Sequence, residues 1–297
     1  MPGKEELDIV ADIPGPHFEV RQPARRAPAG SCDCHVHVFG QPADVELSAL
    51  RDYTPHEATL EQCQRMHAVL GFERVVIVQP SPYGTNNAYQ QQHVRELGEN
   101  ARGVAVVDMS TTDATLEQLC DDGFRASRMN LVNSGSSQTS ALNTIAERIR
   151  PLGWHLEICV RVHELRELVP KISGLAIDTV IDHMGIPDPV QGPEQEGFQA
   201  LLELLKNGKT WVKLSGPYHI DVSDVPWPKA NPFARALISA APDRCIWGSD
   251  WPHPHTKGPM PNDGDLFDQL LVWTEGDENL MQKILVHNPA ELYGFDQ

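Results

Sequence analysis

Eight short segments rich in β-branched and aromatic residues recur along the 297 residues, and a stretch with helical periodicity separates each from the next. Such alternation predicts a parallel sheet with right-handed helical crossovers. Eight repeats favour a closed (β/α)8 barrel of the TIM type over an open sheet. The predicted strands are 31–38, 74–80, 102–108, 124–132, 154–160, 178–184, 210–216 and 243–250.

Helical segments are predicted between and after these strands, and no linker divides them into separate domains. Residues 1–30 include the stretch PGPHFEVRQPARRAPAG, which predicts an extended N-terminal arm. Residues 31–297 are expected to form one barrel domain. The predicted helices are 57–71, 87–100, 115–123, 141–153, 162–173, 198–208, 232–242 and 278–295.

The chain is strongly acidic, with 24 basic and 41 acidic side chains and a formal net charge of −17. Such a surface repels nucleic acids and anionic membranes, so neither is expected as a partner. An anionic small molecule is not excluded, because a few cations can dominate inside a cleft. The charge does not distinguish a monomer from a small homo-oligomer.

The sequence favours a cytoplasmic protein with reduced thiols. Its six cysteines include no CxxC pair, and no stretch is long and apolar enough to span a membrane. The first residues, MPGKEELDIVADIPGP, are acidic and lack the apolar core of a signal peptide.

Histidines and one aspartate fall where the predicted strands end. In SCDCHVHVFG (31–40), His35 and His37 lie two residues apart, so in a strand their imidazoles project to one side. His183 ends the sixth predicted strand and Asp250 the eighth. A barrel brings the carboxyl ends of its strands together, and its chemistry is found there. These four residues are therefore the predicted catalytic set.

Five segments resemble the amidohydrolase superfamily in order and spacing: DCHVHVFG, VIDHMGIPD, WVKLSGPY, IWGSDWPHP and NPAELYGF. Within it, the similarity is greatest to the lactonase branch that contains the pyrone-dicarboxylate and sulfomuconolactone hydrolases. The likeness covers about residues 31–295. It implies a (β/α)8 fold and a hydrolase of carboxylic ester bonds that opens a small lactone during the degradation of aromatic compounds.

Lactone hydrolysis requires attack by water, stabilisation of an oxyanion and a proton for the leaving oxygen. Asp250 is the predicted general base. His35, His37 and His183 either donate hydrogen bonds to the carbonyl oxygen or bind one Zn or Mn ion together with Asp250. Metal-binding relatives usually contribute a histidine from strand five, where this chain has Cys159. The resemblance therefore favours metal-free catalysis.

An anionic lactone requires cations and hydroxyl donors in its pocket. Arg128, near the end of the fourth strand, is the predicted anion clamp, and Arg161 is a second candidate. Cys159 replaces a tyrosine that is functional in the pyrone-dicarboxylate branch. Two arginines of that branch are also missing, at Ile186 and at Tyr218 or His219. Their loss favours a sulfomuconolactone-like substrate, or a neutral sugar lactone, over that dicarboxylate. Cys159 remains a candidate substrate contact, and the other candidates are Ser81, Tyr83, Thr85 and His253.

Three alternative functions share the same barrel. The first is a metal-dependent decarboxylase, because the wider superfamily includes such enzymes with a similar histidine and aspartate set. The second is a lactone isomerase, which uses the same proton transfers without net addition of water. The third is a non-catalytic binding barrel, which the intact set of four polar residues disfavours.

Overall fold

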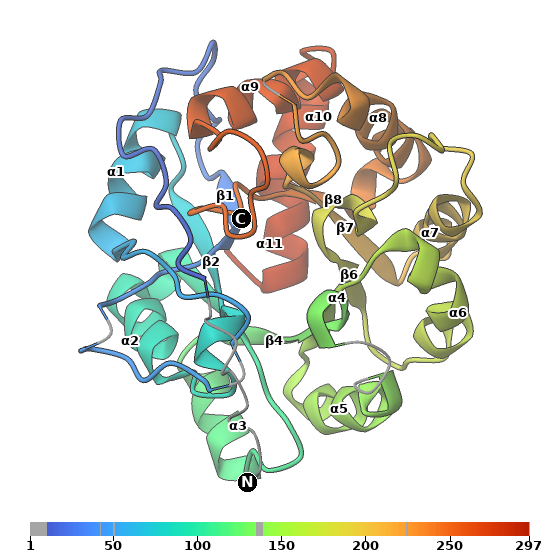
Figure 1. Cartoon of the computed structure of the whole chain (residues 1–297). Helices are drawn as coiled ribbons and strands as arrows, with labels where there is room; N and C mark the ends of the chain where they lie inside the picture. The colour runs from blue at the N-terminus through green and yellow to red at the C-terminus, as the bar shows by residue number, and fades with distance from the viewer. Residues whose placement is uncertain (1–10, 42, 50, 135–138, 224, 297) are drawn as a thin grey trace, which may run out of the picture.

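The computed structural model describes residues 11–296 except residues 42, 50, 135–138 and 224. Within these residues, eight parallel strands pair in chain order from β1 to β8, and helices surround them (Figure 1). The predicted (β/α)8 barrel is confirmed. The strands are β1 (Cys32–Val36), β2 (Arg74–Val78), β3 (Ala101–Ala105), β4 (Phe124–Asn130), β5 (His155–Cys159), β6 (Thr179–Ile181), β7 (Thr210–Leu214) and β8 (Cys245–Trp247).

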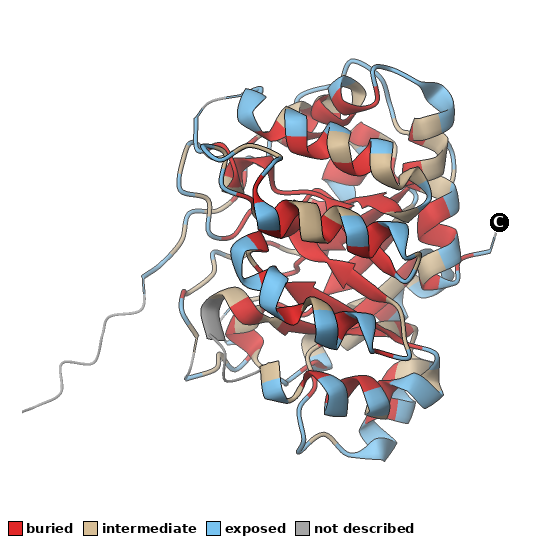
Figure 2. Ribbon diagram, turned by 90° about the vertical axis from the view of Figure 1, so that its right-hand side faces the viewer, coloured by how far each residue is buried: buried red, intermediate tan, exposed pale blue. Residues whose placement is uncertain are grey.

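The helices turn their apolar faces to the strands and their polar faces outward (Figure 2). A capping box formed by Thr59 and Gln62 begins α1, and Gly71 ends it in the left-handed conformation. No helix of the described chain is long and apolar enough to cross a membrane. The helices are α1 (Leu60–Leu70), α2 (Ala88–Leu97), α3 (Asp113–Asp121), α4 (Leu131–Ser134), α5 (Leu142–Ile149), α6 (Val162–Ser173), α7 (Glu196–Lys206), α8 (Asn231–Ala240), α9 (Asp263–Trp273), α10 (Glu278–Gln282) and α11 (Asn288–Tyr293).

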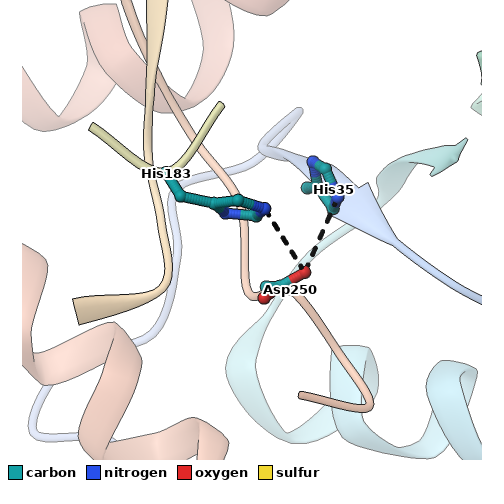
Figure 3. A group of neighbouring side chains, drawn as sticks. All are labelled: His35, His183 and Asp250. Atoms are coloured by element: carbon teal, nitrogen blue, oxygen red, sulfur yellow. Dashed lines mark ion pairs between the residues drawn. The ribbon is translucent and has the colours of Figure 1, made fainter. Parts of the chain in front are cut away.

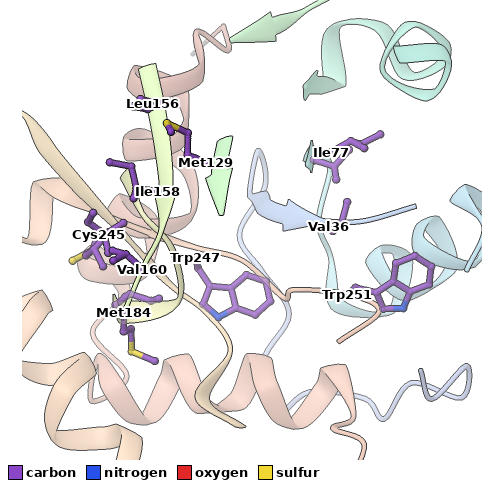
Figure 4. Packing of buried hydrophobic residues seen from close by; sticks show 14 of the residues in the cluster. Val36, Ile77, Met129, Leu156, Ile158, Val160, Met184, Cys245, Trp247 and Trp251 are labelled. Carbon is purple, nitrogen blue, oxygen red and sulfur yellow. The ribbon is translucent and has the colours of Figure 1, made fainter. Parts of the chain in front are cut away.

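Two apolar clusters form the core. The larger cluster fills the space between strands and helices, and Figure 4 shows part of it around Trp247, Ile158 and Val36. The smaller cluster joins residues of the barrel strands, such as Cys34 and Val76, to Tyr293 and other residues of the C-terminal segment. Helix α11 lies behind the ring of strands in Figure 1, so it covers the end of the barrel opposite the predicted site.

Several strands end earlier than predicted, because the chain turns sharply where the polar residues begin. Strand β6 ends at Ile181, and the next residues form a short 3-10 turn in which His183 and Met184 have φ of 51° and 56°. Strand β8 ends at Trp247, and Asp250 has φ of 61°. Residues in the left-handed region cannot continue a strand.

The described part of the N-terminal arm, residues 11–30, contains no helix and only an isolated bridge between Asp12 and Thr54. It runs over the surface of the barrel. The Arg21 side chain donates hydrogen bonds to Asp265 and Asp268 of α9. Residues 1–10 of the predicted arm lie outside the described residues.

Candidate active site

Three imidazoles surround one carboxylate oxygen at the carboxyl end of the barrel. Asp250 Oδ1 lies 3.6 Å from His35 Nε2, 3.7 Å from His37 Nε2 and 4.0 Å from His183 Nε2. Figure 3 shows the His35 and His183 rings directed at this oxygen from opposite sides. The sequence prediction that these four residues meet therefore agrees with the geometry. Their catalytic role remains a proposal.

A β-bulge in β1 aims the histidines into the barrel mouth. Asp33 pairs with Val75 whereas Val36 pairs with Ile77, so β1 has one residue more than β2 over this stretch. A bulge reverses the side-chain alternation and leaves a backbone N–H without a strand partner. The His35 N–H donates to Asp33 Oδ1 at 3.2 Å instead.

Asp33 also connects β1 to the segment that carries Asp250. Its Oδ1 accepts a second hydrogen bond from the Ser249 N–H at 2.9 Å, and its Oδ2 lies 3.0 Å from His67 Nε2 of α1. Next to these contacts, the Asp250 N–H donates to the His35 carbonyl at 2.9 Å. Backbone hydrogen bonds of this kind fix the distance between the carboxylate and the paired histidines.

Gly248 permits this close approach of the two segments. A Cβ atom at this position would lie 2.6 Å from His35 Cβ and 2.9 Å from its backbone nitrogen. Those separations are far below van der Waals contact, so any side chain at residue 248 would push β8 away from β1.

Hydrogen-bond partners behind the rings determine where the protons of His35 and His37 lie. The Lys213 ammonium donates to His35 Nδ1 at 3.0 Å, so the Nε2 of a neutral His35 carries its proton. His37 Nδ1 lies 2.8 Å from the Val78 carbonyl, which only accepts, so His37 Nδ1 carries the proton and Nε2 is the accepting nitrogen. At the barrel mouth His35 is therefore a hydrogen-bond donor and His37 an acceptor.

Burial keeps the imidazoles neutral. Burial is the main cause that lowers the pKa of His37 and of His183 to about 4, and it lowers the pKa of His35 well below its usual value. Burial alone would raise the pKa of Asp250, but the neighbouring His183, His219 and His37 lower it below the usual range. At neutral pH the site therefore contains a carboxylate facing neutral rings.

Tyr218 and His219 contact the other oxygen of Asp250. The Tyr218 hydroxyl donates to Asp250 Oδ2 at 2.6 Å, and His219 Nε2 lies 3.3 Å from the same atom. Burial and the nearby carboxylate raise the pKa of Tyr218 well above its usual value, so the hydroxyl keeps its proton. The sequence did not identify these residues as partners of Asp250. The sequence feature that could have identified them is their position shortly after the end of β7.

Behind the site, charged residues pair inside the barrel. The Lys213 ammonium lies 2.5 Å from Glu157 Oε2 and 3.4 Å from Asp182 Oδ1. Burial opposes the charge on Lys213, but Glu157 and Asp182 outweigh burial and raise its pKa. Arg128 Nε donates to Asp182 Oδ2 at 2.8 Å. The predicted anion clamp is thus anchored by a carboxylate that directly follows β6, two strands away in the barrel.

A cavity of about 280 Å³ opens above these groups. Its wall includes His37, His183 and Asp250, and three cationic side chains, Arg128, Arg161 and Lys257, also line it. No described acidic side chain forms an ion pair with Arg161 or Lys257. We call this space the catalytic cavity. Its cations suit a substrate with an anionic group.

The remaining predicted contacts divide into two groups. Ser81 and Cys159 line the catalytic cavity, and burial raises the pKa of Cys159 to about 12, so it is a neutral thiol. Tyr83 is buried away from the cavity, where its hydroxyl accepts from the Gly40 N–H, and Thr85 lines a neighbouring cavity. His253 is fully buried between Tyr218 and Asp263.

The spacing of three of the four predicted ligands, His35, His183 and Asp250, fits a divalent ion. Zinc bound tetrahedrally at about 2.0–2.1 Å separates its ligand atoms by about 3.4 Å, and the separations from Asp250 Oδ1 are 3.6–4.0 Å. His35, His183 and Asp250 form one of several buried groups that can hold a metal. Asp250 Oδ1 has no hydrogen-bond partner among the described residues. His35, in contrast, directs a protonated nitrogen inward, which suits donation better than coordination.

Comparison with known proteins identifies the family. The model of the amidohydrolase family matches residues 32–295. The chain belongs to this family. It is 38% identical to a 2-pyrone-4,6-dicarboxylate hydrolase of Comamonas testosteroni, over 97% of this chain and 95% of that protein. It is 33% identical to a 4-sulfomuconolactone hydrolase of Hydrogenophaga intermedia, over 98% and 97% of the two chains.

A solved structure of this amidohydrolase group has the same fold. It comes from Acinetobacter baumannii, is described as a 2-pyrone-4,6-dicarboxylic acid hydrolase and contains bound citric acid. Its TM-score is 0.80 at 30% identity, and the match covers 90% of this chain and all 100% of that chain. The relatives hydrolyse anionic lactones, so this amidohydrolase belongs to a group of lactone hydrolases.

Proposed function

We propose that this amidohydrolase opens a small anionic lactone by adding water to the ring ester. The observation that carries the proposal is the buried Asp250 Oδ1, which no described hydrogen-bond donor satisfies and which faces three imidazole nitrogens. A carboxylate with a free lone pair at the barrel mouth can accept a proton from water. The cationic wall of the adjoining cavity supports an anionic substrate.

The reaction needs one proton acceptor and at least one donor. Water attacks the carbonyl carbon while Asp250 takes its proton, which gives a tetrahedral intermediate with a negative oxygen. We assign donation to that oxygen to the His35 Nε2–H, because the Lys213 contact at Nδ1 leaves the ring proton on Nε2. The ring C–O bond then breaks, and the proton on Asp250 passes to the leaving oxygen. The product is a hydroxy acid or its keto tautomer.

Two contacts position Asp250 for these steps. Tyr218 and His219 contact Oδ2, so Oδ1 is the oxygen left for water. Arg128 and Arg161 would hold the anionic group of the substrate, and Ser81 would donate a hydrogen bond. A sulfomuconolactone-like substrate, with a carboxylate and a sulfonate, suits this arrangement.

We further propose that the reaction proceeds without a metal. The proton on His35 Nε2 supports this, because a coordinating nitrogen must offer a lone pair. If His35 offered that lone pair instead, a divalent ion held by His35, His183 and Asp250 would polarise the ester carbonyl and lower the pKa of water.

A panel of lactones, assayed with and without prior chelator treatment of the enzyme, tests the proposal. Purified enzyme is assayed with sulfomuconolactone, 2-pyrone-4,6-dicarboxylate, a monocarboxylated 2-pyrone and a neutral sugar lactone, before and after dialysis against a chelator. We expect acid release from at least one anionic lactone, a smaller rate with the neutral one, and no loss after chelation. Metal content is measured on the same samples.

The alternative outcomes identify the competing functions. Release of carbon dioxide with an intact ring would identify a decarboxylase, and conversion between two lactones without acid release would identify an isomerase. Loss of activity on chelation that returns with Zn or Mn would contradict the metal-free mechanism while leaving the lactonase proposal intact.

A further inference from the structure

A second cavity, of about 570 Å³, adjoins the catalytic cavity. Ser81, Arg128 and Asn130 line both spaces, so the two cavities adjoin at these residues. The second cavity lies where β3 and β4 end and α5 begins. It takes no part in the chemistry proposed above, and we call it the annex.

The annex is mainly apolar. Val107, Met129 and Ile145 are buried, with exposed fractions of 7%, 6% and 2%, and they belong to the main hydrophobic core. Their faces toward the annex are therefore held rigidly by the packing behind them. Met109 forms part of its outer rim and is 61% exposed. The apolar lining residues are Val106, Val107, Met129, Ala141 and Ile145.

Arg128 lines both cavities, but the other charged side chains give the catalytic cavity more cations and the annex more carboxylates. Arg161 and Lys257 line only the catalytic cavity, whereas the carboxylates of Asp52 and Asp108 line only the annex. Hydrogen bonds from Ser110 and Thr111 lower the pKa of Asp108, which keeps it negatively charged. A second anionic group would be repelled from the annex. An uncharged apolar group would not be repelled, and its burial against Val106, Val107 and Ile145 would strengthen binding.

We infer that the annex is a subsite for an uncharged alkyl or aryl substituent on the lactone ring. This inference rests on the proposed lactonase function and narrows its substrate class. The anionic part of the substrate is held in the catalytic cavity, and an apolar substituent passes Arg128 and Asn130 into the annex. A compact dicarboxylate would leave the annex filled only with water.

The test compares a parent lactone with a set of propylated derivatives that are isomers of one another. The parent is a monocarboxylated 2-pyrone, and each isomer carries an n-propyl group at a different free ring carbon. Each buried methylene is worth about fourfold in kcat/KM. We expect at least one isomer to exceed the parent by about tenfold or more with the wild-type enzyme.

Matched variants connect this preference to the annex. Val107→Phe fills the annex, and we expect it to reduce the ratio of kcat/KM between isomer and parent to about two or less. Val272→Phe on α9 makes the same change at a half-exposed residue that lines neither cavity, and it should leave the ratio unchanged. If Val107→Phe does not fold, Met109→Trp at the exposed rim is used and should also lower the ratio.

The outcomes separate this inference from the proposed function. Parent hydrolysis with no preferred isomer, or a preference that survives both annex variants, overturns the annex subsite and leaves the lactonase proposal standing. If the wild type hydrolyses none of these lactones, calorimetric binding of the ring-opened hydroxy acids gives the answer. Tighter binding of a propylated acid, lost in Val107→Phe, supports the annex, and equal binding of all acids overturns it.

Discussion

Single hydrogen bonds determine the chemistry of each ring in the site. His35 Nδ1 accepts a hydrogen bond from the Lys213 ammonium, and His37 Nδ1 donates one to the Val78 carbonyl. The two imidazoles therefore present opposite groups to the same space, one an N–H and the other a lone pair. Their Nε2 atoms lie 3.2 Å apart, as expected for one donor and one acceptor.

Replacing Asp250 tests the proposed general base. Asp250→Asn keeps the shape and the contact with Tyr218 but cannot accept a proton from water. We expect kcat to fall by about a hundredfold or more on any lactone the wild type hydrolyses. The control is Asp113→Asn, the same change at an exposed residue of α3. Near-normal turnover in Asp250→Asn would rule out the assigned role.

Two arginines of β4 provide a matched test of the anion clamp. Arg128 lines the catalytic cavity, whereas Arg125 donates to backbone carbonyls of Cys120 and Phe124. We expect Arg128→Met to raise KM for anionic lactones by about tenfold or more, and Arg128→Lys to restore part of the binding. Arg125→Met should leave KM unchanged. An unaltered KM in Arg128→Met for every anionic lactone would refute the clamp.

The low pKa values of His37 and His183 predict the pH dependence of stability in chelator-treated protein. Both rings have a pKa of about 4 in the folded state, against about 6.5 unfolded. Between these values the unfolded chain binds more protons than the folded protein does. The free energy of unfolding therefore rises with pH and falls on acidification. Between neutral pH and pH 4, each ring lowers the free energy of unfolding by about 3 kcal/mol.

Urea unfolding at several pH values between 4.5 and 7 measures this slope. His183→Gln should make it shallower, while His56→Gln, at an exposed residue, should not change it. An identical slope in wild type and His183→Gln would contradict the assignment.

At the scale of elements, the bulge in β1 and the turn after β8 depend on one buried carboxylate. Asp33 accepts the N–H groups of His35 and Ser249, and α1 supports it through His67. The histidine pair and Asp250 are thus positioned by the same side chain, although Asp33 itself lines neither cavity.

We predict that Asp33 positions the site and takes no part in the chemistry. Asp33→Asn keeps an oxygen for the two N–H groups, so we expect kcat to fall by less than about tenfold. Asp33→Ala removes the acceptor, and kcat should fall by about a hundredfold while KM changes little. Circular dichroism and melting curves identify the fraction folded. If Asn and Ala variants are equally active per folded molecule, the positioning role is refuted.

Across the whole molecule, a chain of buried polar contacts joins the closed end of the barrel to its mouth. Tyr293 of α11 donates to Glu157 at 2.7 Å, Glu157 pairs with Lys213, and Lys213 donates to His35. The charges in this chain are balanced only when every member is present, because buried charges without partners are costly.

Substitutions along this series of buried contacts should therefore differ in how far they lower the free energy of unfolding. Lys213→Met leaves Glu157 without its cation, and we expect the free energy of unfolding to fall by about 3–5 kcal/mol. Tyr293→Phe removes one hydrogen bond to the same carboxylate and should cost about 1–3 kcal/mol. Chemical denaturation measures both changes. A smaller loss in Lys213→Met than in Tyr293→Phe would contradict the charge balance described here.

The sequence by itself determined the order of the strands and of most helices, although it missed α9, and it determined the convergence of His35, His37, His183 and Asp250. Alternating patterns of apolar residues are local, and a parallel barrel brings its strand ends together whatever the details of packing. Only the tertiary structure decided the bulge in β1, the proton positions on the rings, the contacts of Tyr218 and His219, and the annex. These depend on atoms from distant segments, such as Lys213 and His35 at 178 residues apart, whose separation no local pattern encodes.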